Sequence, residues 1–156
     1  MVKGMELMDY NALIAFFDEY NAHFRSFLKF EYSKMDLLNK GDIEKLSASL
    51  STEQAFIMKS NSLEKQRFAL LGDNSTKSFE QIVSEAPDEY KSRLDEQRIS
   101  LSEMVYKIKE LNDTANIIVS ERLKKIRSTV GELDTYNGKG AVKKDGAVNS
   151  TILTNA

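Results

Sequence analysis

The chain of 156 residues contains no cysteine, only one proline and only seven glycines. Without cysteine it has no disulfides, no thiolate metal sites and no cysteine nucleophile. Glycine and proline interrupt helices, and their scarcity leaves three uninterrupted stretches, at residues 5–40, 42–71 and 88–130. Strands average about five or six residues. Stretches this long therefore predict long helices.

The chain also lacks an excess of charge of either sign. Its 22 basic and 24 acidic residues give a formal net charge of -2, so no overall basic field concentrates nucleic acid. No signal peptide is recognisable, and no apolar run reaches the roughly 18 residues that a membrane span requires. We therefore expect a cytoplasmic protein without membrane insertion, whose choice of partner rests on shape and apolar surface.

Apolar residues recur every three or four positions in each long stretch, which places them on one face of a helix. Most of the aromatic residues lie between Tyr10 and Tyr32. Such density is better explained by burial between helices than by helix propensity. Gly41 suits the left-handed position after a first helix, Asp42 the N-cap of a second helix, and Thr76 the N-cap of a short one.

These patterns predict an all-α protein: an elongated antiparallel helical bundle or coiled coil of three long helices and one short helix, with a C-terminal tail. The expected helices occupy residues 5–40, 42–71, 77–84 and 88–133. They form one helical domain, 1–136, and the small, polar and basic residues of 137–156 predict a flexible tail. The last helix is the longest, so about ten residues at its C-terminal end should lack a packing partner.

Few residues of the chain could form a catalytic site. His23 is the only histidine, and the aromatic residues around it include no further ligand and no candidate nucleophile, which favours a structural or surface role. The segment 72–78 lacks the glycine that a phosphate-binding loop needs just before its lysine. The sequence predicts no enzyme activity, no cofactor and no metal site.

Two polar features of the last helix leave alternatives open. Four basic residues cluster there: Arg122, Lys124, Lys125 and Arg127. They either complement the negative end of the helix dipole or recognise an acidic partner; nucleic acid is disfavoured because no neighbouring aromatic pattern offers base stacking. Asn112 and Asn116 lie one helical turn apart, where a polar pair either sets helix register or contacts a partner.

The order of these signals between Leu37 and Tyr136 resembles the flagellar export chaperones of the FlgN type. A glycine–aspartate step at residues 38–46, a second helix that ends near residue 72, and a short helix with its turn at 79–87 follow in the family's order. The most specific match is the segment 111–118, Leu-Asn-Asp-Thr-Ala-Asn-Ile-Ile, which is similar to an asparagine-containing segment of the family.

The resemblance implies a non-enzymatic, cytoplasmic chaperone that binds hook-associated proteins of the hook–filament junction. Such a chaperone prevents their premature assembly and delivers them to the flagellar type III export gate. The client-binding candidates are Leu123, Ile126, Val130 and Leu133. Tyr136 is the candidate for docking at the export gate. Helix geometry points independently to the same place, because the overhanging end would expose the apolar stripe from Leu123 to Leu133.

Long amphipathic helices are common to many proteins, so a second interpretation remains. The chain could be a structural coiled-coil scaffold or dimerisation module with no secretion client, and the sequence leaves homodimerisation open.

Overall fold

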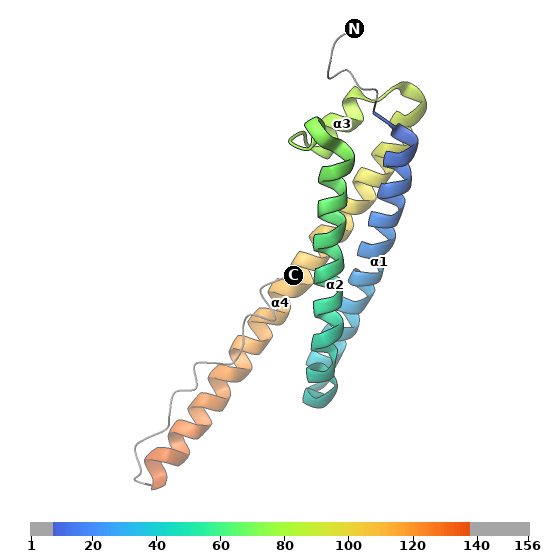
Figure 1. The fold of residues 1–156 in the computed structure, drawn as a ribbon. Helices are drawn as coiled ribbons and strands as arrows, with labels where there is room; N and C mark the ends of the chain where they lie inside the picture. Colours follow the sequence, from blue (N-terminus) through green and yellow to red (C-terminus); the bar gives the residue numbers. More distant parts are fainter. Residues whose placement is uncertain (1–7, 138–156) are drawn as a thin grey trace.

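The structure is a computed structural model that describes residues 8–137, with side-chain environments for residues 8–131. Its elements in chain order are α1 (Tyr10–Lys40), α2 (Ile43–Leu71), the 3-10 turn η1 (Gly72–Asn74), α3 (Phe79–Glu85) and α4 (Asp88–Asn137). Within residues 8–137 there is no strand, and the long helices pack against one another (Figure 1). The prediction of an all-α helical bundle is therefore confirmed. Apart from Asn137, the expected tail 137–156 lies outside the described residues.

Local capping explains where the first two helices begin and end. The Asp9 side chain accepts a hydrogen bond of 3.0 Å from the backbone N–H of Ala12, so α1 begins at Tyr10 rather than at the expected residue 5. Gly41 has a left-handed backbone with φ of 70°, as predicted, and ends α1. The predicted N-cap of α2 is also confirmed, since the Asp42 side chain accepts from Lys45.

The ends of the other two helices differ from expectation. The N-cap of α3 is Ser78, not Thr76, because the Ser78 hydroxyl accepts a hydrogen bond of 3.1 Å from the backbone N–H of Gln81. α4 continues to Asn137, four residues past the expected end at 133. No described helix is long and apolar enough to span a bilayer.

α1 is the central helix of the bundle and packs against both α2 and α4. Figure 1 shows that α2 runs antiparallel to α1 and that α4 runs parallel to it, with the short α3 beside the start of α4. The rings of Tyr10 and Tyr90 stack with centroids 5.3 Å apart, so α1 and α4 begin at the same level. The Gln97 side-chain amide donates to the Ile14 carbonyl oxygen (2.9 Å) and to Asp18 (2.8 Å), which aligns the two helices.

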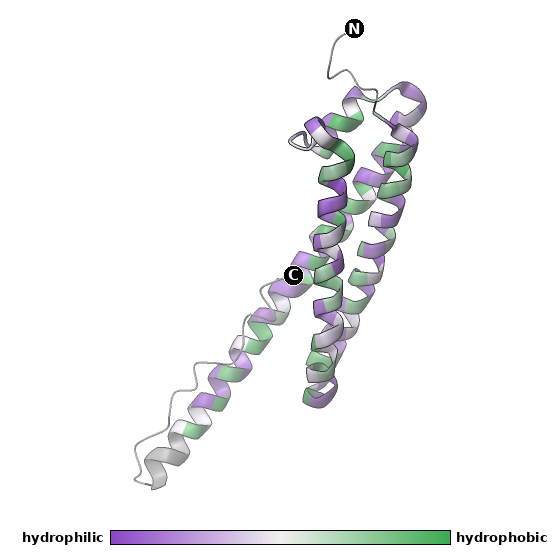
Figure 2. Ribbon diagram, in the orientation of Figure 1, coloured by the Kyte–Doolittle hydropathy of each residue, from purple (hydrophilic) through white to green (hydrophobic). Residues whose placement is uncertain are grey.

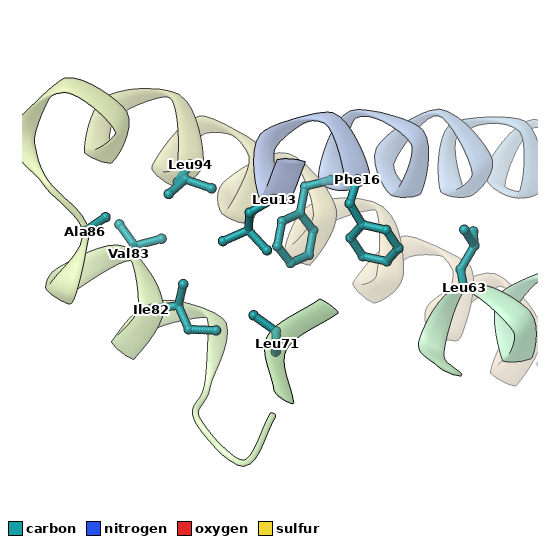
Figure 3. Packing of buried hydrophobic residues seen from close by; sticks show 9 residues of the cluster. Leu13, Phe16, Leu63, Leu71, Ile82, Val83, Ala86 and Leu94 are labelled. Atoms are coloured by element: carbon teal, nitrogen blue, oxygen red, sulfur yellow. The ribbon is translucent and has the colours of Figure 1, made fainter. Parts of the chain in front are cut away.

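The hydrophobic core lies at the end of the bundle where all four helices meet (Figure 3). Its buried residues are Leu13, Phe16, Phe17, Leu63, Leu71, Ile82, Val83, Ala86 and Leu94. An aromatic series continues along α1: Phe17 stacks on Phe79 with centroids 4.0 Å apart, and Phe27 stacks on Phe56 at 5.2 Å. The expected burial of the α1 aromatics is confirmed for Phe16, Phe17 and Phe27, whereas Tyr32 is half exposed.

Candidate functional site

The C-terminal part of α4 extends beyond the α1–α2 hairpin (Figure 1). Ala115 is the last buried residue among the described side chains of α4, and every side chain from residue 116 to 131 is exposed or only partly buried. We call residues 116–137 the overhang; at about 1.5 Å per residue it is roughly 33 Å long. It exceeds the ten residues expected from the sequence because α1 has only 31 residues and α4 has 50, while both begin at the same level.

The overhang carries an apolar stripe formed by Val119, Leu123, Ile126 and Val130. Successive residues of an α-helix are rotated by about 100°, so Ile126 lies on the same face of α4 as the buried Ile108 and close to that of Ala115. The face that packs inward within the bundle therefore continues beyond the hairpin, and no other described helix covers it there. Ile126 is 58% exposed and Val130 37% exposed, while Leu123 is half-buried. The alternation of apolar and polar residues along α4 is visible in Figure 2.

Leu133 and Tyr136 belong to α4, but their side chains lie outside the described residues. Leu133 follows Val130 at a spacing of three residues, which places its backbone position on the face of the apolar stripe. The structure thus brings three of the four client-binding candidates together on one face, and the backbone position of the fourth agrees with it.

A groove of about 490 Å³ lies between α1, α2 and α4, just before the overhang begins. Its apolar lining comes from Phe24, Phe27, Ile57, Val105 and Ile108. Asn112 and Asn116 both line it. The Asn112 side chain is buried, and its Oδ1 accepts no hydrogen bond from the side chains and backbone that the structure describes. The two asparagines therefore lie where the bundle interface passes into the overhang.

The family model described as FlgN protein matches residues 5–145. The chain belongs to the FlgN family. FlgN proteins are flagellar export chaperones, and the family is one of chaperones rather than of enzymes. No curated protein and no solved structure gave a match.

In this FlgN-family chain the single histidine is structural. His23 is buried, its ring contacts those of Phe24 and Phe56, and its Nε2 lies 2.7 Å from the Ser60 hydroxyl. Burial, together with nearby Lys59, lowers the pKa of His23 and keeps the ring neutral. Within residues 8–131 no three potential ligands converge on a metal position.

A charge cluster that was not predicted from the sequence is buried between α1 and α2, and we call it the buried triad: Glu31, Lys34 and Glu53. All three side chains are almost fully buried. Lys34 Nζ lies 2.8 Å from Glu31 Oε2 and also donates a short hydrogen bond to Glu53. The signal was present in the sequence, because Glu53 stands three residues after Leu50 and four before Ile57, on the apolar stripe of α2.

One lysine balances only one of the two carboxylates in the buried triad. Burial raises the pKa of Glu31 to about 7, and the neighbouring Glu53 carboxyl contributes in the same direction, while Lys34 opposes it. Between pH 4.5 and about 7 the folded protein therefore holds a proton on Glu31 that an unfolded chain releases. The triad serves the α1–α2 interface and takes no part in the overhang.

This proton predicts a pH dependence of stability. Because the folded pKa of Glu31 lies above its ordinary value of 4.5, the free energy of unfolding should fall as pH rises from 4.5 to about 7 and level off above that. The slope approaches about 1.4 kcal/mol per pH unit. Glu31→Gln should reduce this slope of the free energy of unfolding against pH. Urea unfolding measured at several pH values tests this, with the exposed Glu19→Gln on the same helix as control. An unchanged slope in Glu31→Gln would assign the proton elsewhere.

Proposed function

We propose that this FlgN-family chaperone binds hook-associated proteins of the hook–filament junction in the cytoplasm, keeps them unassembled and delivers them to the flagellar type III export gate. One observation carries the proposal: the face of α4 that packs against α1 continues along the overhang, where no other helix of residues 8–137 packs against it. Single exposed apolar residues are ordinary on protein surfaces, but a continuous apolar stripe on an unpartnered helix is typical of an interaction site.

The client-binding surface is the stripe from Leu123 to Leu133. Leu123, Ile126 and Val130 follow spacings of three and four residues, the pattern by which one amphipathic helix packs along another. From Leu123 to Leu133 this surface extends about 15 Å. That length suits a helical segment of several turns at a terminus of the client. Binding would bury the stripe and so prevent the client segment from pairing with its assembly partners.

Two further assignments extend this surface. Asn112 and Asn116 line the groove at the base of the overhang, so they either set the register of α4 against the hairpin or contact a client helix that reaches the groove. Tyr136, near the C-terminal end of α4, is the candidate for docking at the export gate. In this arrangement client and gate would use successive segments of one helix.

The test is co-purification with a hook-associated protein, analysed by size-exclusion chromatography with light scattering. A chaperone should form a soluble complex of fixed stoichiometry with the terminal helical segment of the client, and removal of that segment should abolish the complex. A scaffold or dimerisation module should instead self-associate through the overhang and should not bind the client. That second result would overturn the proposed function.

A further inference from the structure

The basic cluster of the overhang surrounds the apolar stripe. At about 100° per residue, Arg122 and Lys125 lie on one side of Ile126 and Arg127 lies on the other, while Lys124 points to the opposite face of α4. A surface hollow of about 380 Å³ is lined by both kinds of residue: Arg122, Lys125, Ile126, Thr129 and Val130. Positive charge and apolar surface thus belong to one continuous site.

The helix dipole does not explain this cluster. α4 continues to Asn137, its last turn contains no basic residue, and Arg127 lies ten residues, or about 15 Å, before its end. The favourable effect of a basic side chain on the negative end of a helix is confined to the last turn. Of the two explanations that the sequence left open, the one based on the dipole is therefore removed.

Among the side chains of residues 8–131, no ion pair neutralises the cluster either. The described carboxylates within 4 Å of a lysine or arginine pair with residues of the bundle, and none of these pairs includes residues 122–127. Residues 117–131 contain four basic side chains and one carboxylate, Glu121, a local charge of +3, although the whole chain carries -2. Glu132 and Asp134 follow in the last turns of α4, so the whole overhang, residues 116–137, carries a formal charge of +1, and its positive charge is concentrated at residues 122–127.

We propose that the apolar stripe takes an amphipathic helix whose own apolar face is flanked by aspartate and glutamate side chains. Paired helices are selected by the charges that border their apolar seam, so Arg122, Lys125 and Arg127 favour carboxylates at the flanking positions of the partner. A second copy of this chain fits poorly, because overlapping overhangs would bring two basic clusters together. Nucleic acid fits poorly because residues 117–131 offer no aromatic ring for base stacking.

This inference rests on the proposed function, since it names the chemistry of the helix that the client-binding surface accepts. Its test uses the full chain and two designed amphipathic peptides of about three heptads with identical leucine faces, one with glutamate and one with lysine at the flanking positions. At about 50 mM salt the protein should bind the glutamate peptide at least about tenfold more tightly. The difference should shrink at about 0.5 M salt, where charges are screened.

Variants of the chain complete the experiment. The double change Arg122→Glu with Arg127→Glu should abolish or reverse the preference for the glutamate peptide. Lys124→Glu alters the charge on the opposite face and should leave this preference unchanged. Equal affinity for both peptides, or an equal effect of Lys124→Glu, would overturn the inference. Binding of a DNA duplex in preference to both peptides, lost in the double variant, would overturn it in favour of nucleic acid.

A parallel titration with a hook-associated protein separates this inference from the proposed function. If the client binds but the peptides show no preference, the charge selection is wrong and the chaperone function stands. If the client itself does not bind to the wild-type chain, the proposed function fails.

Discussion

Ile126→Asp should reduce client affinity by at least about 100-fold while leaving the helical content of the protein unchanged. Truncation of a central apolar anchor typically costs about 2–4 kcal/mol, and an aspartate adds the cost of burying a charge against the client helix. Ile126 is 58% exposed in the free chain, so the change removes no packing from the bundle. Val130→Asp should act in the same direction. Isothermal titration gives the affinity and far-UV circular dichroism the helicity.

Ile117 provides a matched control for this experiment. It is an isoleucine of the same helix and is 60% exposed, but it lies nine residues from Ile126 and therefore half a turn away around α4. Ile117→Asp should leave client affinity within about twofold. If both aspartate variants bind equally poorly, the loss comes from charge or helix destabilisation in general. The stripe would then not be the binding face.

Lys34→Met is expected to lower the free energy of unfolding by about 3 kcal/mol or more at pH 7. The change removes the one cation of the buried triad and leaves the Glu31 and Glu53 carboxyl groups buried beside each other. Removal of one partner from a buried ion pair typically costs about 3–5 kcal/mol, because the remaining charge has neither water nor a counter-ion. The loss should diminish as pH falls below about 7, the pKa of Glu31, because the Glu31 carboxyl group then takes up a proton.

The control for Lys34 is Lys40→Met on the same helix. Lys40 pairs with Asp36 at 2.9 Å, but both side chains are more than 60% exposed, and such surface pairs contribute less than about 1 kcal/mol. Replacing all three triad residues by methionine should recover most of the stability, since a buried charge network is often matched by apolar residues of similar volume. If Lys34→Met and Lys40→Met lower the free energy of unfolding by similar amounts, water reaches the triad. Chemical denaturation followed by circular dichroism distinguishes these results.

Local chemistry explains why the helices were predictable. Gly41 adopts the left-handed conformation that ends α1, and Asp42 caps α2, so the sequence alone placed the reversal between the first two helices. The prediction that Thr76 is the N-cap of α3 was wrong, because three nearby residues with hydroxyl groups could each cap this seven-residue helix: Ser75, Thr76 and Ser78. Which of these residues becomes the cap depends on the path of the chain after η1. The periodicity of the sequence does not predict that path.

The client-binding stripe was also predictable as a pattern. Leu123, Ile126 and Val130 follow helical spacing whether or not a partner covers them. Its exposure was harder to foresee, because it depends on the length of α1 relative to α4 and on the level at which both begin. The buried triad was missed for a related reason: an acidic residue on an apolar stripe is recognisable, but its lysine partner lies on another helix.

The sequence by itself determined that this protein is a set of long amphipathic helices, since scarce glycine and proline allow little else and backbone propensity acts locally. Tertiary structure alone decided which apolar residues remain without a partner. Ile117 and Ile126 are equally exposed isoleucines of one helix, yet only Ile126 continues the face that packs on α1. The basic cluster also lies beside this exposed stripe and far from the end of the helix, because α4 extends beyond the α1–α2 hairpin against which it packs.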